Sequence, residues 1–167
     1  MPHTKLTYEL VREYLGYNPD DGSFVWLKKP CNRIVVGSTA GYMRSDGYKM
    51  LGLFGGPYLY HRVAWLWMTG KEALSDIDHI DGNPSNNAFS NLRLATRSQN
   101  NMNQKTQRTS KSGLKGSWWC NKDRRWYGRI TLNGRGYHLG SYDCPAAAHF
   151  AYQIAANKMF GEYSRIA

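Results

Sequence analysis

One segment, residues 78 to 100, concentrates the side chains that most restrict how this chain can fold and work. It begins with Asp-His-Ile-Asp-Gly-Asn at residues 78–83, continues through Asn-rich sequence to Asn-Leu-Arg at 91–93, and ends at Asn100. A carboxylate, a histidine beside it and a later amide are the groups needed to hold one divalent metal ion and activate one water next to a phosphate. The pattern predicts a nuclease site.

An ordinary turn is the simpler interpretation of the same residues. Asp-Gly and Asn-Pro are turn dipeptides, and Asx side chains often bond their own backbone in loops. The order of elements favours a site instead, because residues 77–80 read as a strand end and residues 92–95 alternate as a second strand. Thr96 and Gln99 then form a capping box that starts a helix at about Arg97. This order would let Asp78 and Asn100 face each other across a small wedge.

The segment from about residue 60 to residue 104 resembles the His-Asn-His endonuclease family, in the variant whose last histidine is replaced by asparagine. The resemblance rests on the Asp-His-x-Asp-Gly-Asn, Asn-Leu-Arg and terminal Asn elements. It implies that Asp78 and Asn100 bind the metal and that His79 is the general base. It also implies that Asn91 braces the loop that orients His79.

Two further residues of this segment belong to the same interpretation. Asn87 is a weaker candidate for loop bracing, and His61 lies where such enzymes often carry a histidine. For His61 a structural hydrogen bond and a phosphate contact stay open as alternatives. The chemistry fits the residue types, since carboxylate and amide oxygens suit Mg²⁺ or Mn²⁺. A histidine with an ordinary pKa of about 6.5 accepts a proton from water near neutrality.

Other site classes fail on spacing. The acids around residue 78 resemble a calcium loop, but the third acid and the glycine are displaced and no Glu closes the loop. The glycines of residues 52–56 lack the Gly-Lys-Ser/Thr of a nucleotide-binding loop. Cys31, Cys120 and Cys144 form no Cys-x-x-Cys pair, so we expect no structural zinc and no disulfide framework.

Charge indicates a nucleic-acid partner and where it binds. The formal net charge is +10, and residues 102–167 carry 11 basic and 3 acidic side chains. A charge run is usually a solvated face, but here the basic residues alternate with aromatic residues, which favours a DNA-binding module. Residues 101–112 are polar and basic and read as a linker, with three candidate phosphate contacts, Lys105, Arg108 and Lys111.

Residues 113–163 predict three strands and one helix. Strands are expected at 117–120, 126–132 and 137–140, with an Asn-Gly hairpin turn at 133–134. A helix over 146–160 follows Pro145 and ends at Gly161. Alternation along the second strand directs one set of side chains toward the helix, namely Trp126, Gly128, Ile130 and Leu132, and the other set outward, namely Tyr127, Arg129 and Thr131. The helix itself is expected to bury an apolar stripe formed by Ala147, Phe150, Ala151, Ile154 and Ala155.

This segment resembles the Apetala-type (ethylene-response-factor) DNA-binding domain of plants, through its Leu-Gly-x-Tyr-Asp turn and its closing Phe-Gly-Glu-Tyr. The resemblance implies that the outward sheet face lies in the major groove of duplex DNA. Trp118 and His138 stand where plant members commonly have arginine and tryptophan, so the plant target sequence is not carried over. The implied reading surface is Trp118, Cys120, Arg124, Tyr127, Arg129, Thr131 and His138. Separately from this resemblance, Lys122, Arg125 and Arg135 are candidate phosphate clamps, and His61 and Arg62 are candidate DNA contacts from the nuclease part.

The sequence therefore predicts an α+β protein of two domains. Residues 1–104 form a ββα-metal nuclease core (about 60–104) with a small N-terminal sheet, residues 105–112 a basic linker, and residues 113–167 a separate three-stranded antiparallel sheet packed on one helix. The N-terminal part is expected to carry a helix over 7–15, a strand over 24–27 and a hairpin over 48–60, next to a nuclease helix over 63–68.

The expected function is site-specific DNA cleavage, dependent on Mg²⁺ or Mn²⁺, by a homing-endonuclease-like enzyme of the kind encoded by phages and mobile introns. We expect a monomer that nicks double-stranded DNA. The alternative is a transcriptional regulator whose nuclease-like half is catalytically inactive. No signal peptide is recognised and the longest strongly apolar run, 63–68, is too short to span a bilayer, so a cytoplasmic protein without membrane contact is expected.

Overall fold

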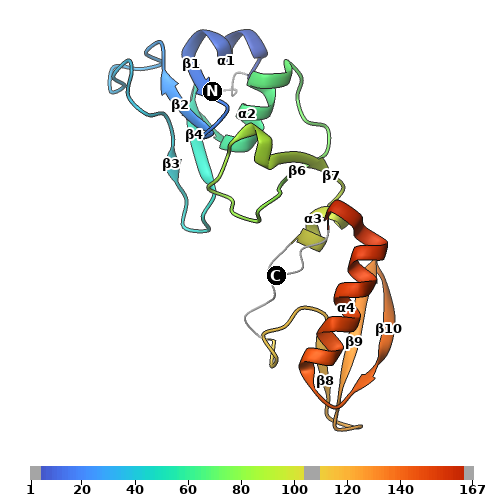
Figure 1. The fold of residues 1–167 in the computed structure, drawn as a ribbon. Coiled ribbons are helices and arrows are strands. Elements are labelled where there is room, and N and C mark those ends of the chain that lie inside the picture. Colours follow the sequence, from blue (N-terminus) through green and yellow to red (C-terminus); the bar gives the residue numbers. More distant parts are fainter. Residues whose placement is uncertain (1–4, 104–109, 164–167) are drawn as a thin grey trace. The chain divides into compact units, whose positions relative to one another are not determined.

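The computed structural model describes residues 5–103 and 110–163. The chain divides into two compact units, Met1–Ala95 and Thr96–Ala167. Both units combine short helices with small antiparallel sheets, which makes this a mixed α and β protein (Figure 1). The division groups the helix that follows Ala95 with the second unit, although the sequence prediction placed a boundary after residue 104. No helix in the described ranges is long and apolar enough to cross a membrane.

The described part of the first unit contains two α-helices, one short 3₁₀ helix, two antiparallel strand pairs and a three-stranded sheet. Helix α1 (Tyr8–Tyr14) leads into a hairpin of β1 (Leu15–Asn18) and β2 (Ser23–Trp26). The sheet has the order β3-β4-β5, with β3 (Tyr42–Met43), β4 (Lys49–Leu53) and β5 (Gly56–Leu59). After α2 (Tyr60–Thr69), β6 (Asp76–His79) pairs antiparallel with β7 (Leu92–Ala95), which follows the short 3₁₀ helix η1 (Phe89–Asn91).

Helix α2 lies at the centre of the first core. Its Tyr60 and Val63 are each 1% exposed, and the Tyr60 ring packs edge-on against Phe24 with ring centroids 4.9 Å apart. The Tyr60 hydroxyl accepts from the Phe24 amide at 2.7 Å and donates to the Ala40 carbonyl at 3.2 Å. Tyr60 was predicted to end a strand, but it starts the helix, because the first helical turn buries it against β2. Gly70, at φ 69°, ends α2 in the left-handed region that favours glycine.

Strands β6 and β7 form where the sequence predicted strands. Their register pairs Asp78 with Arg93 and His79 with Leu92. Two short strands, β1 and β3, were not predicted. β1 follows α1 without a connecting loop and contains a glycine, which weakens a strand pattern.

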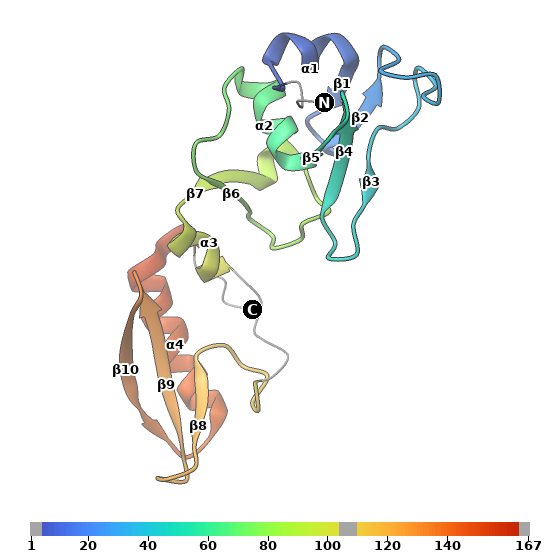
Figure 2. The same cartoon turned by 180° about the vertical axis from the view of Figure 1, so that it is seen from behind.

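The second unit starts with helix α3 (Arg97–Asn103) and continues with a three-stranded antiparallel sheet of order β10-β9-β8. Its strands are β8 (Ser117–Cys120), β9 (Arg125–Leu132) and β10 (Arg135–Tyr142), followed by α4 (Pro145–Phe160) and the 3₁₀ helix η2 (Gly161–Tyr163). Figure 2 shows the three strands side by side in front of α4. The predicted hairpin turn is present, with Asn133 and Gly134 at φ 49° and 78°.

The face of β9 that packs on α4 is the predicted one, since Gly128 and Ile130 are buried while Arg129 and Thr131 are exposed. The predicted stripe of α4 is wrong except at Ala155, which packs against the core of the second unit. The buried residues of α4 are Ala148, Tyr152, Ala156 and Phe160.

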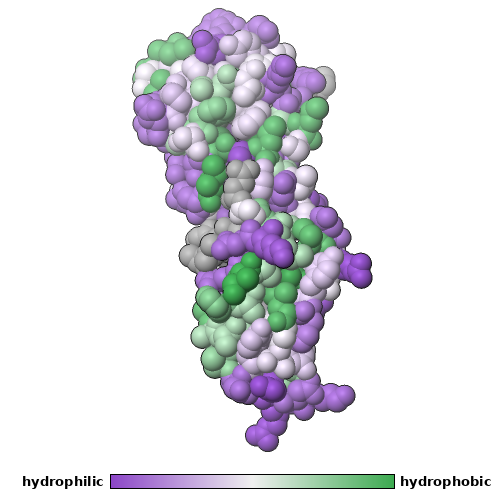
Figure 3. All heavy atoms as spheres, turned by 45° about the vertical axis from the view of Figure 1, so that its right-hand side comes forward, coloured by the Kyte–Doolittle hydropathy of each residue, from purple (hydrophilic) through white to green (hydrophobic). Residues whose placement is uncertain are grey.

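Two residues of the predicted stripe, Phe150 and Ile154, are 63% and 56% exposed. Apolar side chains do reach the surface of the second unit (Figure 3). The physical reason is close packing: a side-chain carbon at Gly128 would lie 3.2 Å from the carbonyl oxygen of Ala148. Only a small residue of α4 fits against the sheet at this point. Because both sides of the helix carry apolar residues, the sequence pattern alone does not show which side is buried.

Candidate active site

His79 is the last residue of β6 and is only 5% exposed. Two other rings surround it. The His61 ring lies with its centroid 5.0 Å away at an interplanar angle of 87°, and the Tyr48 ring lies 6.1 Å from His79 and 5.8 Å from His61. The base candidate is therefore held inside the first unit, in aromatic surroundings.

A hydrogen bond to Asn87 fixes which nitrogen of His79 carries the proton. The Nε2 atom of His79 lies 3.3 Å from Oδ1 of Asn87, and Nδ2 of Asn87 donates to the Ser85 carbonyl at 3.0 Å. Because the amide thus presents its oxygen to the ring, Nε2 is the donor and Nδ1 holds the basic lone pair. Burial lowers the pKa of His79, against the opposing effects of the Asn87 bond and of Asp81 and Asp78. The ring is therefore neutral at neutral pH.

Asp78 precedes His79 and is 3% exposed. Its carboxylate forms an ion pair with Arg93, directly opposite on β7, with Nη2 2.7 Å and Nε 2.9 Å from Oδ2. The pair is buried, since the side chains of Arg93 and Asp78 are 13% and 4% exposed. The cross-strand arginine thus fixes the orientation of the carboxylate.

Asn91 ties together the loop between β6 and β7. Its Nδ2 donates to Oδ1 of Asp81 at 3.0 Å and to the Asn86 carbonyl at 2.9 Å, while its Oδ1 accepts from the Asp81 amide at 3.0 Å. Burial acts to raise the pKa of Asp81, but hydrogen bonds from Asn83, Asn86 and Asn91 outweigh it and the pKa is lowered. The ionised Asp81 therefore serves as the acceptor at the centre of the loop.

Asn100 lies on α3, which begins as predicted. The Thr96 amide donates to Oε1 of Gln99 at 2.8 Å, and the Gln99 amide donates to the Thr96 hydroxyl at 3.3 Å. Met102 of the same helix is 7% exposed and packs in the second core with Ile130 and its neighbours. Asn100 therefore belongs to the second unit, whereas Asp78 belongs to the first. That the two residues bind one metal ion together stays a prediction.

His61 and Arg62 both contact other residues of the first unit. His61 is 6% exposed, and its Nδ1 has no hydrogen-bond partner among the described residues. Burial, followed by the nearby His79 and Arg62, lowers the pKa of His61 to about 3. Arg62 donates to the carbonyl of Ser75 at 3.3 Å and to that of Ala73. Both alternatives for His61, a structural hydrogen bond and a phosphate contact, stay predictions, as does a DNA contact by Arg62.

The predicted DNA-reading face carries a row of three rings on adjacent strands. Trp118 and His138 flank Tyr127, with ring centroids 6.0 Å and 4.7 Å from it. Trp118 is 56% exposed, whereas Cys120 is 8% exposed, which contradicts its predicted place on this surface. The burial follows from the turn after β8, where the Cys120 thiol approaches Oδ2 of Asp123 at 3.4 Å.

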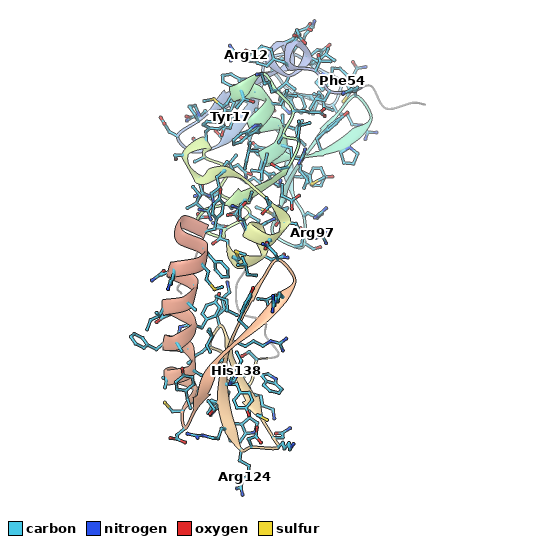
Figure 4. All side chains as sticks on the ribbon, turned by 90° about the vertical axis from the view of Figure 1, so that its right-hand side faces the viewer. Arg12, Tyr17, Phe54, Arg97, Arg124 and His138 are labelled. Carbon is cyan, nitrogen blue, oxygen red and sulfur yellow. The ribbon has the colours of Figure 1, made fainter. Side chains whose placement is uncertain are left out.

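The predicted phosphate contacts differ in their surroundings. Arg124 lies at the tip of the β8–β9 hairpin and points away from the sheet (Figure 4). Arg125 forms an exposed ion pair with Asp143 at 2.8 Å. Lys105 and Arg108 lie outside the described residues, and the remaining candidates are exposed: Lys111, Lys122, Arg129, Thr131 and Arg135.

Sequence reasoning missed three residues of the site: Arg93, Tyr48 and Tyr17. Arg93 stands in the Asn-Leu-Arg element, and its pairing with Asp78 follows once β6 and β7 are set in antiparallel register. Tyr48 and Tyr17 reach the site from distant parts of the chain, and no local signal marks them.

Comparison with known proteins identifies the family. Residues 58–102 match the HNH endonuclease family profile. The chain is 38% identical over 89 residues to Protein 3.8 of Escherichia phage T7. This match covers 53% of this chain and 73% of the phage protein. It is 31% identical over 132 residues to an uncharacterized HNH endonuclease of Acanthamoeba polyphaga mimivirus. That match covers 78% of this chain and 67% of the mimivirus protein. The chain belongs to the HNH endonuclease family.

HNH endonucleases are nucleases, and they generally use a divalent metal ion. The donor chemistry of this chain fits such an ion, because the Asp78 carboxylate and the Asn100 amide offer the oxygen ligands that Mg²⁺ and Mn²⁺ prefer. No solved structure shows a significant match to the chain.

Proposed function

We propose that the chain is a metal-dependent, site-specific DNA endonuclease that hydrolyses a phosphodiester with a water activated by His79. The observation that carries the proposal is the hydrogen bond from Nε2 of His79 to Oδ1 of Asn87, which leaves Nδ1 as the basic nitrogen that would accept a proton from the attacking water. Such a bond is the usual means of fixing a histidine tautomer.

In the proposed reaction Nδ1 of the neutral His79 ring takes a proton from the attacking water, and the resulting imidazolium lies beside Asp78 and Asp81. The lowered pKa of His79 keeps the ring in its proton-accepting form at neutral pH. Asn91 keeps the β6–β7 loop in the shape that holds this ring. Arg93 keeps the Asp78 carboxylate in one orientation.

Asp78 and Asn100 are the residues that would hold the divalent metal ion, with β6, β7 and α3 as a ββα-metal core. When bound, such an ion supplies stabilisation of the negative charge that grows on the phosphate and on the leaving oxygen. We propose Mg²⁺ or Mn²⁺ as the ion.

The second unit supplies the DNA-binding surface in this proposal. Its sequence resembles the Apetala-type reader, and one face of its sheet carries Trp118, Tyr127, Arg129 and His138. Aromatic and basic side chains on one exposed face suit base and phosphate contacts respectively. A monomer has one copy of the catalytic motif and would nick one strand.

A plasmid assay tests the proposal. The purified chain should convert supercoiled plasmid to the nicked form with Mg²⁺ or Mn²⁺, and EDTA should stop the reaction. His79→Ala should slow nicking by about 10²- to 10⁴-fold at unchanged DNA affinity, whereas the control His149→Ala, in the second unit, should nick at near wild-type rate. Nicking that survives full chelation, or a fully active His79→Ala protein, would contradict the mechanism. Metal-independent DNA binding without any nicking would favour a regulator instead.

A further inference from the structure

The hairpin of β1 and β2 touches the loop behind His79 at three points. The Tyr17 hydroxyl donates to the Asn87 carbonyl at 2.6 Å, and the Phe89 amide donates to the Pro19 carbonyl at 2.9 Å. At Gly22, with φ 68°, an added side-chain carbon would lie 2.1 Å from the carbonyl carbon of Asn87. The backbone of the hairpin turn therefore lies directly against the Asn87 peptide.

This contact is buried and closely packed. Asn87 is 1% exposed and Tyr17 7% exposed. The Tyr17 ring, labelled in Figure 4, is packed between Phe24 and Trp67, with centroid distances of 4.7 Å and 5.6 Å. Burial raises the pKa of Tyr17, with smaller contributions from Tyr60 and Asp21, so its hydroxyl keeps its proton and donates.

Two successive hydrogen bonds connect Tyr17 to His79. The first fixes the backbone of Asn87, and the second joins the side-chain oxygen of the same residue to Nε2 of His79. Without the Tyr17 hydroxyl the Asn87 carbonyl would lose a donor in a buried place, which costs free energy and favours a shift of the loop. A shift at Asn87 would release the ring of His79 from its present rotation and tautomer.

We propose that Tyr17 is a positioning residue for the cleavage reaction, acting on His79 through Asn87. This inference rests on the proposed role of His79 as general base. Tyr17 lies outside residues 58–102, the segment that matches the family profile. The hairpin therefore gives this chain a support for its base that the shared motif does not contain.

Tyr17→Phe tests the proposal because it removes only the hydroxyl. With supercoiled plasmid and Mn²⁺, we expect kcat to fall roughly fivefold with KM unchanged, which corresponds to losing one ordinary hydrogen bond. The matched control is Tyr60→Phe. Tyr60 is also buried and its hydroxyl also donates to a backbone carbonyl, that of Ala40, but it bonds no residue of the β6–β7 loop among the described contacts. Tyr60→Phe should lower stability and leave kcat at the wild-type value.

A double-mutant cycle shows whether Tyr17 acts through Asn87. Asn87→Ala should reduce kcat by tens of fold, since a misplaced base costs up to about 10²-fold. In that background Tyr17→Phe should change kcat less than twofold, because the connection is already broken. Independent, multiplicative effects of the two substitutions would overturn the proposal.

Imidazole ¹⁵N NMR gives a readout that does not depend on cleavage. The His79 signals, assigned by their loss in His79→Gln, should show a ring protonated at Nε2 in the wild-type chain. Tyr17→Phe and Asn87→Ala should raise the Nδ1-protonated population, and Tyr60→Phe should not. If the wild-type chain nicks plasmid but Tyr17→Phe keeps both its kcat and its imidazole spectrum, Tyr17 has no positioning role. If instead the wild-type chain fails to nick at all, the proposed function falls, and the spectra still decide the positioning.

Discussion

Arg93 holds Asp78 across the β6–β7 pair with two nitrogens on one carboxylate oxygen, Nη2 at 2.7 Å and Nε at 2.9 Å from Oδ2. Because both side chains are almost fully buried, the pair is screened little by solvent. Arg93 orients the carboxylate and also neutralises its charge, so it opposes the attraction of a cation to Asp78. If Asp78 is a metal ligand, Arg93 would therefore both orient this carboxylate and weaken its binding of the ion.

Replacing Arg93 with methionine should separate these two effects. Arg93→Met leaves a buried carboxylate without its partner, so we expect a loss of about 3–5 kcal/mol in the free energy of unfolding without metal. Mn²⁺ should then raise the Tm of this variant more than it raises the Tm of the wild-type chain. Calorimetric scans with and without Mn²⁺ measure both effects.

Arg125→Met is the matched control for Arg93→Met. Arg125 pairs with Asp143 in an exposed position, with side chains 44% and 91% exposed. Exposed pairs contribute about 1 kcal/mol or less, so this variant should unfold nearly as the wild type does. An equal Mn²⁺ shift in Arg93→Met and in the wild-type chain would argue against Asp78 as a metal ligand.

The sequence revealed local features of the site, while the partners of those features depend on long-range packing. The Thr96–Gln99 capping box and the Asn-Gly turn at 133–134 are decided within a few residues, and both form as predicted. Asp78 lies opposite Arg93 only in the observed register of β6 and β7. The loop between the two strands sets this register, and the sequence does not reveal the path of that loop. Tyr17 and Asn87 are 70 residues apart in the sequence, and no sequence pattern near Tyr17 predicts their contact.

A second prediction concerns the buried His61. Its pKa is about 3 in the folded chain against an ordinary 6.5, owing to burial and then to the nearby His79 and Arg62. The unfolded chain thus takes up the proton first, and the contribution of His61 to stability is complete above pH 6.5 and is lost as pH falls toward 3. At pH 5 the loss should be about 2 kcal/mol relative to neutral pH.

His61→Phe removes this titration while keeping a ring against His79. Urea unfolding at several pH values should show a wild-type stability that declines from pH 7 to pH 5, and a shallower decline for the variant. The remaining slope of the variant reports the other groups, His79 among them. Identical slopes for the two proteins would mean that His61 is already protonated in the fold or remains accessible to solvent.

Asn91→Ala tests the bracing of the β6–β7 loop. The change removes three hydrogen bonds, two to Asp81 and one to Asn86, and leaves the Asp81 amide without its present acceptor. We expect a destabilisation of about 1–3 kcal/mol and fast hydrogen exchange at the Asp81 amide. Ser90→Ala, at an exposed position between the same two strands, is the control and should alter stability by about 0.5 kcal/mol or less. Retained protection of the Asp81 amide in Asn91→Ala would show that another group holds the loop.

The helix α4 shows why a strong apolar pattern misled the sequence analysis. Ala147, Phe150, Ala151 and Ile154 share one side of the helix, and Ala148, Tyr152, Ala156 and Phe160 share another. Both sides satisfy helical spacing, so periodicity does not choose between them. The choice follows from the close approach of Ala148 to Gly128, a contact that only the folded sheet creates.

The last prediction concerns DNA binding by the tip of the β8–β9 hairpin. Lys122 and Arg124 are exposed there and have no ion pair among the described residues, whereas Arg125 is paired with Asp143. If both tip residues contact phosphates, the double change of Lys122 and Arg124 to alanine should lower the slope of log affinity against log salt by roughly 1.8, from about 0.9 for each contact. Arg125→Ala should lower it less, because Arg125 is already paired with Asp143 and is therefore less available to neutralise a phosphate. Anisotropy titrations of a labelled duplex at several salt concentrations measure these slopes. An unchanged slope for the double variant would place the phosphate contacts elsewhere on the second unit, with Arg129 and Arg135 as the next residues to change.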